Sequence, residues 1–300
     1  MNITITGSLG HISKPLATTL VQKGHAVTVI SSNPEKQKDI ETLGAKAAIG
    51  SMEDVDFLTD TFAGADIVYT MIAGGNYFNP DFDLMAYCSK IGNNYAQAIK
   101  QTGVKRVVHL SSIGAHLEKG SGLILSHRAV EDILRNLQDV DITFVRPVGF
   151  YYNLYVFIPA IKNQGFISAN YGADDSLVWV SPVDIAAAIV KEIETQPVHR
   201  KVIYVASDEL TGNETAGILG AAIDKPGLKW ILISDEQRLS DLKAAGMNPA
   251  IAAGLVEMFS AQHNGLLMED YHRNKPISGK VKMADFAKEF AVAFNKSQDF

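Results

Sequence analysis

A short glycine-containing segment near the amino terminus has the residue types and spacing that a backbone needs to bind a phosphate group. Residues 6–13 read TGSLGHIS and lie between a β-branched run and a helical pattern. Gly7 permits a tight turn, Gly10 lets the backbone approach a diphosphate, and free N–H groups at the helix start attract an anion. Ser13 is small enough to replace the third glycine that is usual there. In this strand-turn-helix context, a turn that binds nothing is the weaker interpretation. We expect a nicotinamide dinucleotide to contact Thr6, Gly7, Leu9, Gly10, His11 and Ile12.

The residues after the second predicted strand favour NADP(H) over NAD(H). An acidic residue there binds the ribose 2′-hydroxyl of NAD(H), whereas a basic residue accommodates the 2′-phosphate of NADP(H). Residues 31–36 read SSNPEK, so no acid occupies the strand end, and hydroxyls with the Lys36 ammonium could bind a phosphate. The alternative, in which Asn33 and Pro34 start a helix and Lys36 is only solvated, stays open. The expected contacts are Ser31, Ser32, Asn33 and Lys36.

Hydroxyl groups and a proline follow the later strands, at the carboxyl edge where parallel sheets bind their ligands. Ser111 and Ser112 end the fifth predicted strand and could donate hydrogen bonds to developing oxyanion charge, although a plain strand-ending pair is the alternative. Pro147 fixes the chain direction and lacks an N–H, which predicts a carbonyl-rich turn beside the nicotinamide. The expected cofactor contacts also include Ala73 and Gly74, which follow the fourth strand.

Four aromatic residues are candidates for substrate binding, namely Tyr77, Phe150, Tyr151 and Tyr152. Their rings could stack on a flat aromatic substrate. Aromatic clusters of this kind are more often part of a core, so both interpretations stay open.

Alternating β-branched runs and helical patterns predict the elements that position these residues. They indicate the α/β class, with a Rossmann-type doubly wound parallel sheet whose carboxyl edge binds ligands. The predicted strands of the sheet are 2–6, 26–30, 45–49, 67–71, 106–110 and 141–145, and 178–180 and 202–205 could rejoin it. The predicted helices are 11–23, 34–43, 55–62, 82–102, 123–137, 182–195, 235–245 and 250–262, with a short strand at 229–233.

The regular alternation ends near Phe150, which marks a change of organisation. We assign residues 1–152 and 177–206 to the NAD(P)-binding domain. Residues 153–176 and 207–300 are expected to form a smaller α+β subdomain on the substrate side.

The composition disfavours several classes of function. The 300 residues carry a net charge of −6, and the sequence pI is near 5.7, which opposes the attraction to phosphate backbones that nucleic-acid binding needs. The single cysteine, Cys88, can form neither an internal disulfide nor a thiolate metal site, so we expect no metal. Without a signal-like start or an apolar run of ~20 residues, the protein is expected to be cytoplasmic and not to span a membrane.

Five segments together resemble the NmrA-like group of atypical short-chain dehydrogenases/reductases, which includes quinone and triphenylmethane reductases and NADPH-sensing regulators. The resemblance covers essentially the whole chain and implies a Rossmann fold that binds a nicotinamide cofactor. The segments are the turn at 6–10, VVHLSS at 107–112, HRAVE at 127–131, Arg146-Pro147 with Asn153, and VDIA at 183–186.

The chain departs from the family at the residues that carry proton transfer. Short-chain dehydrogenases use a Tyr-x-x-x-Lys pair, but Leu123 and His127 stand at the matching positions. A histidine at the lysine position occurs in quinone-reductase-like members, so the resemblance implies that His127 hydrogen-bonds the nicotinamide ribose. The alternative is a helix histidine without a role. Ser32 and Ser51 replace an arginine and an aspartate that are usual in the family, which weakens the expected binding of the adenosine.

Two functions follow from these observations. The first is an oxidoreductase that uses NADPH to reduce a flat conjugated small molecule, such as a quinone, with the proton coming from water or His127. The second is a non-catalytic NADP(H) sensor that acts through a protein partner, with the loop at 118–122 as its moving part. A homodimer is a further alternative, whereas sugar-nucleotide epimerisation is disfavoured because it depends on the missing tyrosine.

Overall fold

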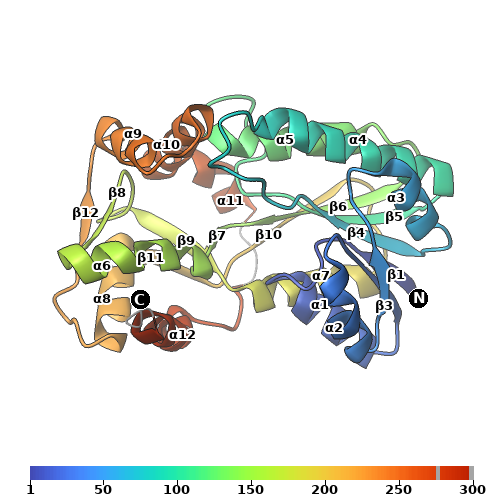
Figure 1. Cartoon of the computed structure of the whole chain (residues 1–300), viewed down its shortest axis with the longest axis horizontal. Coiled ribbons are helices and arrows are strands. Elements are labelled where there is room, and N and C mark those ends of the chain that lie inside the picture. Colours follow the sequence, from blue (N-terminus) through green and yellow to red (C-terminus); the bar gives the residue numbers. More distant parts are fainter. Residues whose placement is uncertain (275–277, 297–300) are drawn as a thin grey trace.

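The computed structural model describes residues 1–274 and 278–296, and its larger part is a seven-stranded sheet (Figure 1). The strands are β1 (Asn2–Ile5), β2 (Ala26–Ser31), β3 (Lys46–Ile49), β4 (Ile67–Met71), β5 (Arg106–Leu110), β6 (Asp141–Pro147) and β10 (Lys201–Val205). All neighbours pair in parallel, in the order β10-β6-β5-β4-β1-β2-β3. The order reverses between β1 and β4, which is where doubly wound sheets bind their ligands. The predicted Rossmann-type sheet is confirmed.

Helices cover both faces of this sheet. They are α1 (Ser13–Gln22), α2 (Gln37–Thr42), α3 (Val55–Phe62), α4 (Leu84–Thr102), α5 (Leu125–Arg135) and α7 (Pro182–Glu194), with short 3-10 helices η1 (Pro34–Lys36) and η2 (Gly122–Ile124) before α2 and α5. On one face, Leu20, Ile40 and Ile189 from α1, α2 and α7 are fully buried in one core. On the other face, Phe62 and Tyr95 belong to a second core with α3, α4 and α5. Each helix therefore buries one apolar side against the sheet.

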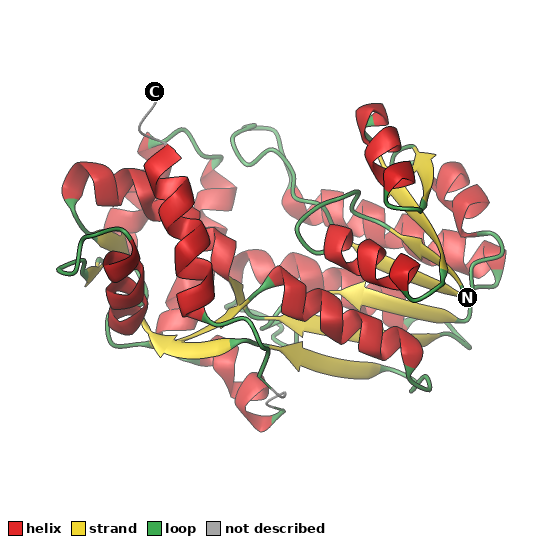
Figure 2. Cartoon of the chain, turned by 90° about the horizontal axis from the view of Figure 1, so that it is seen from below, coloured by secondary structure: helices red, strands yellow, loops and turns green. Residues whose placement is uncertain are grey.

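The remaining elements form a smaller part beside the large sheet (Figure 2). A three-stranded sheet, in the order β11-β9-β7, contains β7 (Gly149–Phe150), β9 (Ser176–Val180) and β11 (Asp208–Thr211), and β8 (Ile167–Ala169) pairs with β12 (Trp230–Leu232). Their core is aromatic and includes Trp179, Trp230 and Phe290. No helix among the described residues is long and apolar enough to cross a membrane. The helices are η3 (Tyr151–Phe157), α6 (Ile158–Gln164), α8 (Gly212–Ala222), α9 (Asp235–Ala244), α10 (Pro249–His263), η4 (Leu266–Met268), α11 (Glu269–Arg273) and α12 (Met283–Lys296).

The strand predicted at 178–180 does not rejoin the large sheet. Only β10 does so, whereas β9 pairs with β7 and β11. The cause is Trp179, which is buried in the aromatic core with its indole N–H donated to Thr215 Oγ1 at 3.2 Å. The segment 177–206, which we assigned to the NAD(P)-binding domain, thus has α7 and β10 on the large sheet and β9 in the smaller one. The domain boundaries themselves stay predictions.

Candidate active site

The turn between β1 and α1 requires glycine at its first position. Gly7 has φ +91°, a conformation that side chains rarely adopt. A Cβ there would come within 2.8 Å of Met71 Sδ and 2.9 Å of Ser13 Oγ. The Ser13 hydroxyl donates to the Thr6 carbonyl at 3.0 Å, so serine at the third position ties the helix to the strand end. The inner side of the turn is therefore tightly packed against Met71 and Ser13.

The outer surface of the same turn is open. Gly10 and His11 are exposed, and a Cβ on Gly10 would contact only the Gly7 carbonyl, at 3.2 Å. Thr6 and Ile12 are buried instead, and the Thr6 hydroxyl accepts from Met71 N at 2.9 Å. Of the predicted contacts, Gly7, Leu9, Gly10 and His11 are thus at least partly exposed. Thr6 and Ile12 hold the turn in place.

Ser31 supports the turn and does not face a ligand, contrary to our expectation. Its side chain is 2% exposed, and its hydroxyl accepts from Ser8 Oγ at 2.9 Å and donates to the Asn33 carbonyl at 3.2 Å. Its backbone carbonyl also accepts from Gly50 N, which joins the ends of β2 and β3. The hydroxyl has no proton left for a 2′-phosphate, because a serine hydroxyl donates only once.

Three of the predicted 2′-phosphate contacts remain, of which Ser32 and Asn33 are exposed and Lys36 is partly exposed. Asn33 caps η1 by accepting from Glu35 N at 2.9 Å, as the alternative interpretation of this segment held. Lys36 Nζ lies 3.2 Å from Asp39 Oδ2, and such a solvent-accessible ion pair contributes little to the unfolding free energy. Ser32 and Lys36 can therefore turn to a phosphate without breaking a buried contact.

His127 lies on α5 and keeps a ring nitrogen without a partner. Burial lowers the pKa of His127, against the opposing effect of Glu131, so the ring is neutral near pH 7. Its Nδ1 is buried and forms no hydrogen bond with any described residue. Because a buried polar atom without a partner is costly, a ligand hydroxyl would be stabilised there. The open glycine turn and this nitrogen together fit a nicotinamide dinucleotide.

Ser111 is committed to a buried ion pair, so it is not the predicted oxyanion donor. Its hydroxyl donates to Glu131 Oε1 at 2.6 Å, and the side chain is 3% exposed. Arg146 binds both oxygens of Glu131, with Nε at 2.9 Å and Nη2 at 2.8 Å, and Arg135 adds a contact at 3.0 Å. Ser112 is partly exposed and stays the candidate donor.

The ion pair extends to the C-terminal region through Arg146. Its Nη1 lies 3.1 Å from Tyr204 Oη and 3.4 Å from Asp270 Oδ2, and Tyr204 also donates to Asp270. Although burial alone raises it, the pKa of Glu131 is lowered by the hydrogen bonds and charge of Arg146 and by its other hydrogen bonds. The roles of Glu131 and Arg146 were not predicted from the sequence. The available signal was an arginine near the end of a mostly apolar predicted strand, since such a charge must be paired when it is buried.

The aromatic candidates separate into two groups. Tyr152 stacks between His11, at 4.5 Å between ring centroids, and Phe150, at 5.0 Å, so these rings connect the glycine turn with the end of β7. Tyr77 stacks on Phe82 in the loop after β4, at 6.3 Å. Ala73 and the exposed Gly74 begin this loop. The Pro147 carbonyl accepts from Ile113 N at 2.9 Å and keeps a second lone pair, so its expected place beside the nicotinamide stays a prediction.

Tyr151 is a core residue and not a substrate contact, which corrects our expectation. It is 1% exposed, stacks on Phe286 at 5.3 Å, and its hydroxyl lies 3.0 Å from Asp208 Oδ2. Tyr151→Phe is expected to lower the unfolding free energy by about 1.5 kcal/mol, because it removes a hydrogen bond to a charged group. Urea unfolding measures this loss. An unchanged stability with an altered KM for an acceptor would contradict the assignment.

His109 makes the folded chain sensitive to acid. Burial lowers the pKa of His109 to about 3 against the raising effect of Glu131, and its Nδ1 lies 2.9 Å from Thr70 Oγ1. Below pH 6.5 the unfolded chain binds a proton there that the folded chain does not bind. The unfolding free energy should therefore fall by about 1.4 kcal/mol per pH unit as pH decreases from 6.5.

His116 and His127 should also lower the unfolding free energy as the pH decreases, because burial lowers the pKa of both side chains in the folded chain. Urea unfolding at several pH values between 7.5 and 5 measures the combined slope. His109→Gln should reduce this slope. A wild-type stability that does not change with pH in this range would contradict the buried neutral state of these rings.

Comparisons with known proteins match the chain to a family and a fold. A family model described as NAD(P)H-binding matches residues 7–196. The chain is 23% identical over 296 residues to a (4-alkanoyl-5-oxo-2,5-dihydrofuran-3-yl)methyl phosphate reductase of Streptomyces griseus, which covers 97% of this chain and 99% of that protein.

Two solved structures have the same fold over nearly the whole chain. An NADPH-dependent quinone oxidoreductase of Escherichia coli, complexed with NADPH, has a TM-score of 0.80 at 20% identity and covers 96% of this chain and 99% of its own. A triphenylmethane reductase of Citrobacter sp. has a TM-score of 0.79 at 20% identity and covers 97% and 100%. These structures share the fold of this chain, and the family model confirms the nicotinamide-binding family that the sequence indicated.

Proposed function

Because the chain belongs to the NAD(P)H-binding family, we propose that it is a reductase that uses NADPH to reduce a flat conjugated acceptor such as a quinone. The observation that carries this proposal is the turn after β1, where Gly7 is required by the backbone and Gly10 leaves the outer surface open. Such a turn, at the switch point of a parallel sheet, binds a diphosphate through backbone N–H groups.

The residues around this turn have separate tasks in the proposed reaction. Reduction of a quinone to a hydroquinone takes one hydride, which NADPH supplies when bound, and one proton. His127 would hydrogen-bond the ribose through its unpartnered ring nitrogen. The proton would come from water, either directly or relayed through this imidazole, which would take up a proton on one ring nitrogen as it releases one from the other. Ser112 would donate a hydrogen bond to the acceptor oxygen that gains negative charge.

NADPH is preferred to NADH in this proposal. Ser32 is exposed directly after β2, where no acidic residue stands, and the partly exposed Lys36 follows in η1. We expect a lower Kd for NADPH than for NADH. With its net charge of −6 and one buried cysteine, the chain also fits the reducing cytoplasm that we propose as its location.

The test is steady-state oxidation of NADPH with a panel of quinones, for the wild-type chain and for His127→Ala. We expect turnover with at least one quinone, and a decrease in kcat of about 100-fold or more in the variant if the ring transfers the proton. A variant that raises only the Kd for NADPH would assign His127 to ribose binding. No turnover of any quinone by the wild-type chain would contradict the proposed reaction.

One observation favours a regulatory sensor as a second candidate. The Ser111 hydroxyl is hydrogen-bonded to the buried Glu131 carboxylate. The Tyr-x-x-x-Lys pair is also absent, so few side chains remain for proton transfer. The loop at 118–122 is less suited to a conformational change than we expected. Ser121 is buried, and a Cβ on Gly122 would lie only 2.0 Å from the Gly254 carbonyl, so the loop is tightly packed where it joins η2.

Limited proteolysis at the exposed Glu118 and Lys119 tests the sensor. A cleavage rate that saturating NADP+ leaves unchanged would remove this candidate. A large decrease, without turnover of any acceptor, would favour it over the reductase.

A further inference from the structure

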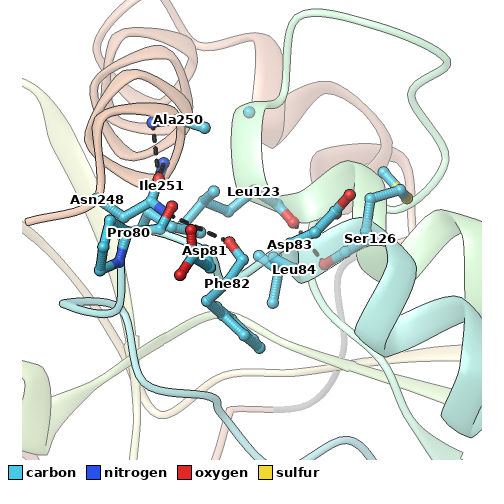
Figure 3. A pocket seen from close by; sticks show the side chains of 12 residues that line it. Pro80, Asp81, Phe82, Asp83, Leu84, Leu123, Ser126, Asn248, Ala250 and Ile251 are labelled. Carbon is cyan, nitrogen blue, oxygen red and sulfur yellow. Dashed lines mark hydrogen bonds between the residues drawn. The ribbon is translucent and has the colours of Figure 1, made fainter.

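A pocket of about 400 Å³ lies between the loop after β4, the start of α5 and the start of α10 (Figure 3). Its volume falls within the range of small-molecule sites. In Figure 3, Asn248 and Ser126 stand on opposite sides, and residues 80–84 run beneath them. None of the side chains identified so far as candidate cofactor or substrate contacts lines it. The lining is Pro80, Asp81, Phe82, Asp83, Leu84, Met85, Gly122, Leu123, Ser126, Asn248, Ala250 and Ile251.

Asn248 holds two walls of this pocket together. The side chain is 5% exposed, and its amide donates to three carbonyls of the loop after β4, those of Asn79, Pro80 and Phe82, at 2.9 to 3.3 Å. Its Oδ1 accepts from the backbone of Ala250 at 2.9 Å and so caps α10. Because one buried side chain bonds both segments, the pocket is formed before any ligand arrives.

The pocket shares two segments with the candidate active site. Leu123 and Ser126 line it and precede His127 by four residues and one residue. The loop that forms its floor follows β4 and also contains Ala73 and Gly74, which we expect beside the cofactor. A molecule in this pocket would therefore contact two chain segments that also carry expected cofactor contacts.

The charge of the pocket selects its ligand. Asp81 and Asp83 are exposed carboxylates, and no lysine, arginine or histidine is among the described residues that line it. Asp83 caps α4 by accepting from Ala86 N, whereas no such bond involves the Asp81 side chain among the described residues. Most of the other lining residues are apolar. An anionic ligand would be repelled, and an apolar ring would be favoured.

We propose that this pocket binds the acceptor, and that the acceptor is a neutral or cationic apolar ring system without a phosphate or sulfonate group. This inference rests on the proposed reductase function and names its substrate class. Asp81 then determines specificity by charge alone, because its side chain has no structural partner in the described chain.

Binding to the NADP+-saturated protein, in which no reduction takes place, tests the proposal by calorimetry. The probes are 1,4-naphthoquinone, its 2-sulfonate, and a derivative carrying a trimethylammonium group. The neutral and cationic probes should bind at least about tenfold more tightly than the sulfonate. Asp81→Lys should reverse the order of the two charged probes.

A second pair of variants locates the site. Ala250 lines the pocket at the first turn of α10, and the nearby Ala253 is exposed on the same helix outside it. Ala250→Trp should weaken binding of the neutral probe at least about tenfold by filling the space, whereas Ala253→Trp should not. The Kd for NADP+ should be the same in both variants.

The outcomes separate this inference from the proposed function. If the wild-type chain bound no NADP+, the proposed function would fail. If it bound NADP+ and reduced quinones, but neither Ala250→Trp nor Asp81→Lys changed probe affinity, only the assignment of this pocket would be overturned. Equal affinity of the wild-type chain for the sulfonate and the ammonium probes would overturn the charge selection.

Discussion

The substitution Gly10→Asp is expected to weaken NADPH binding by at least about 100-fold. A carboxylate on this residue would lie on the open face of the turn, within a few ångströms of the diphosphate. Two like charges about 4 Å apart near a protein surface repel by about 4 kcal/mol, and each 1.4 kcal/mol is tenfold in affinity. Fluorescence or calorimetric titration with NADPH measures the loss.

Gly10→Asn is the matched control, because it has nearly the same shape without the charge. Gly10 is exposed and has no positive φ, so neither variant should reduce the unfolding free energy by more than about 1 kcal/mol. The asparagine variant should bind NADPH at least tenfold more tightly than the aspartate variant. Equal affinities in the two variants would show that no anion lies against this turn.

The second large effect is expected from Arg146→Leu, which should lower the unfolding free energy by about 3 to 5 kcal/mol. Glu131 is 1% exposed and would remain as a buried charge without its bidentate partner, and such a charge is costly. Arg135 reaches only one of the two oxygens. Urea unfolding of the wild-type and variant chains at pH 7.5 measures the difference.

Removing both charges provides the control. The double variant Glu131→Leu, Arg146→Met should recover much of the lost stability, because buried ion pairs are often replaced by apolar residues at little cost. The difference in unfolding free energy between the wild type and Arg146→Leu should also become smaller in acid. The lowered pKa of Glu131 means that the ion pair contributes above pH 4.5 and is lost as pH falls through the folded value. A single variant as stable as the wild type would contradict the buried network.

The elements with strong local patterns could be predicted from the sequence. The predicted bounds of 67–71, 106–110 and 55–62 match β4, β5 and α3. The two strands are short, mostly apolar runs, and 55–62 has apolar residues at helical spacing after the capping Asp54, so the local pattern decides the ends. Helix α8 was missed because four glycine or polar residues begin it, although Thr211 and Glu214 form the capping box that marks its start.

The candidate site was only partly predictable, because its main pairings join residues distant in the sequence. Ser111, Glu131 and Arg146 come from β5, α5 and β6, and they meet only when the parallel strands take their register. A strand-ending serine looks the same whether its hydroxyl faces a ligand or a buried carboxylate. The aromatic run at 150–152 was ambiguous for a similar reason, since neighbouring residues point in different directions and only Tyr151 enters the core.

The most direct test of the account is calorimetric titration of the wild-type chain with NADP+, NADPH, NAD+ and NADH. The open turn at Gly10, the exposed Ser32 and the partly exposed Lys36 predict saturable binding of one dinucleotide per chain, with the lowest Kd for a phosphorylated form. Binding that favoured NAD+ or NADH would contradict the assignment of the 2′-phosphate site. No heat of binding with any of the four, supported by unchanged thermal stability, would contradict the central claim that this turn receives a dinucleotide.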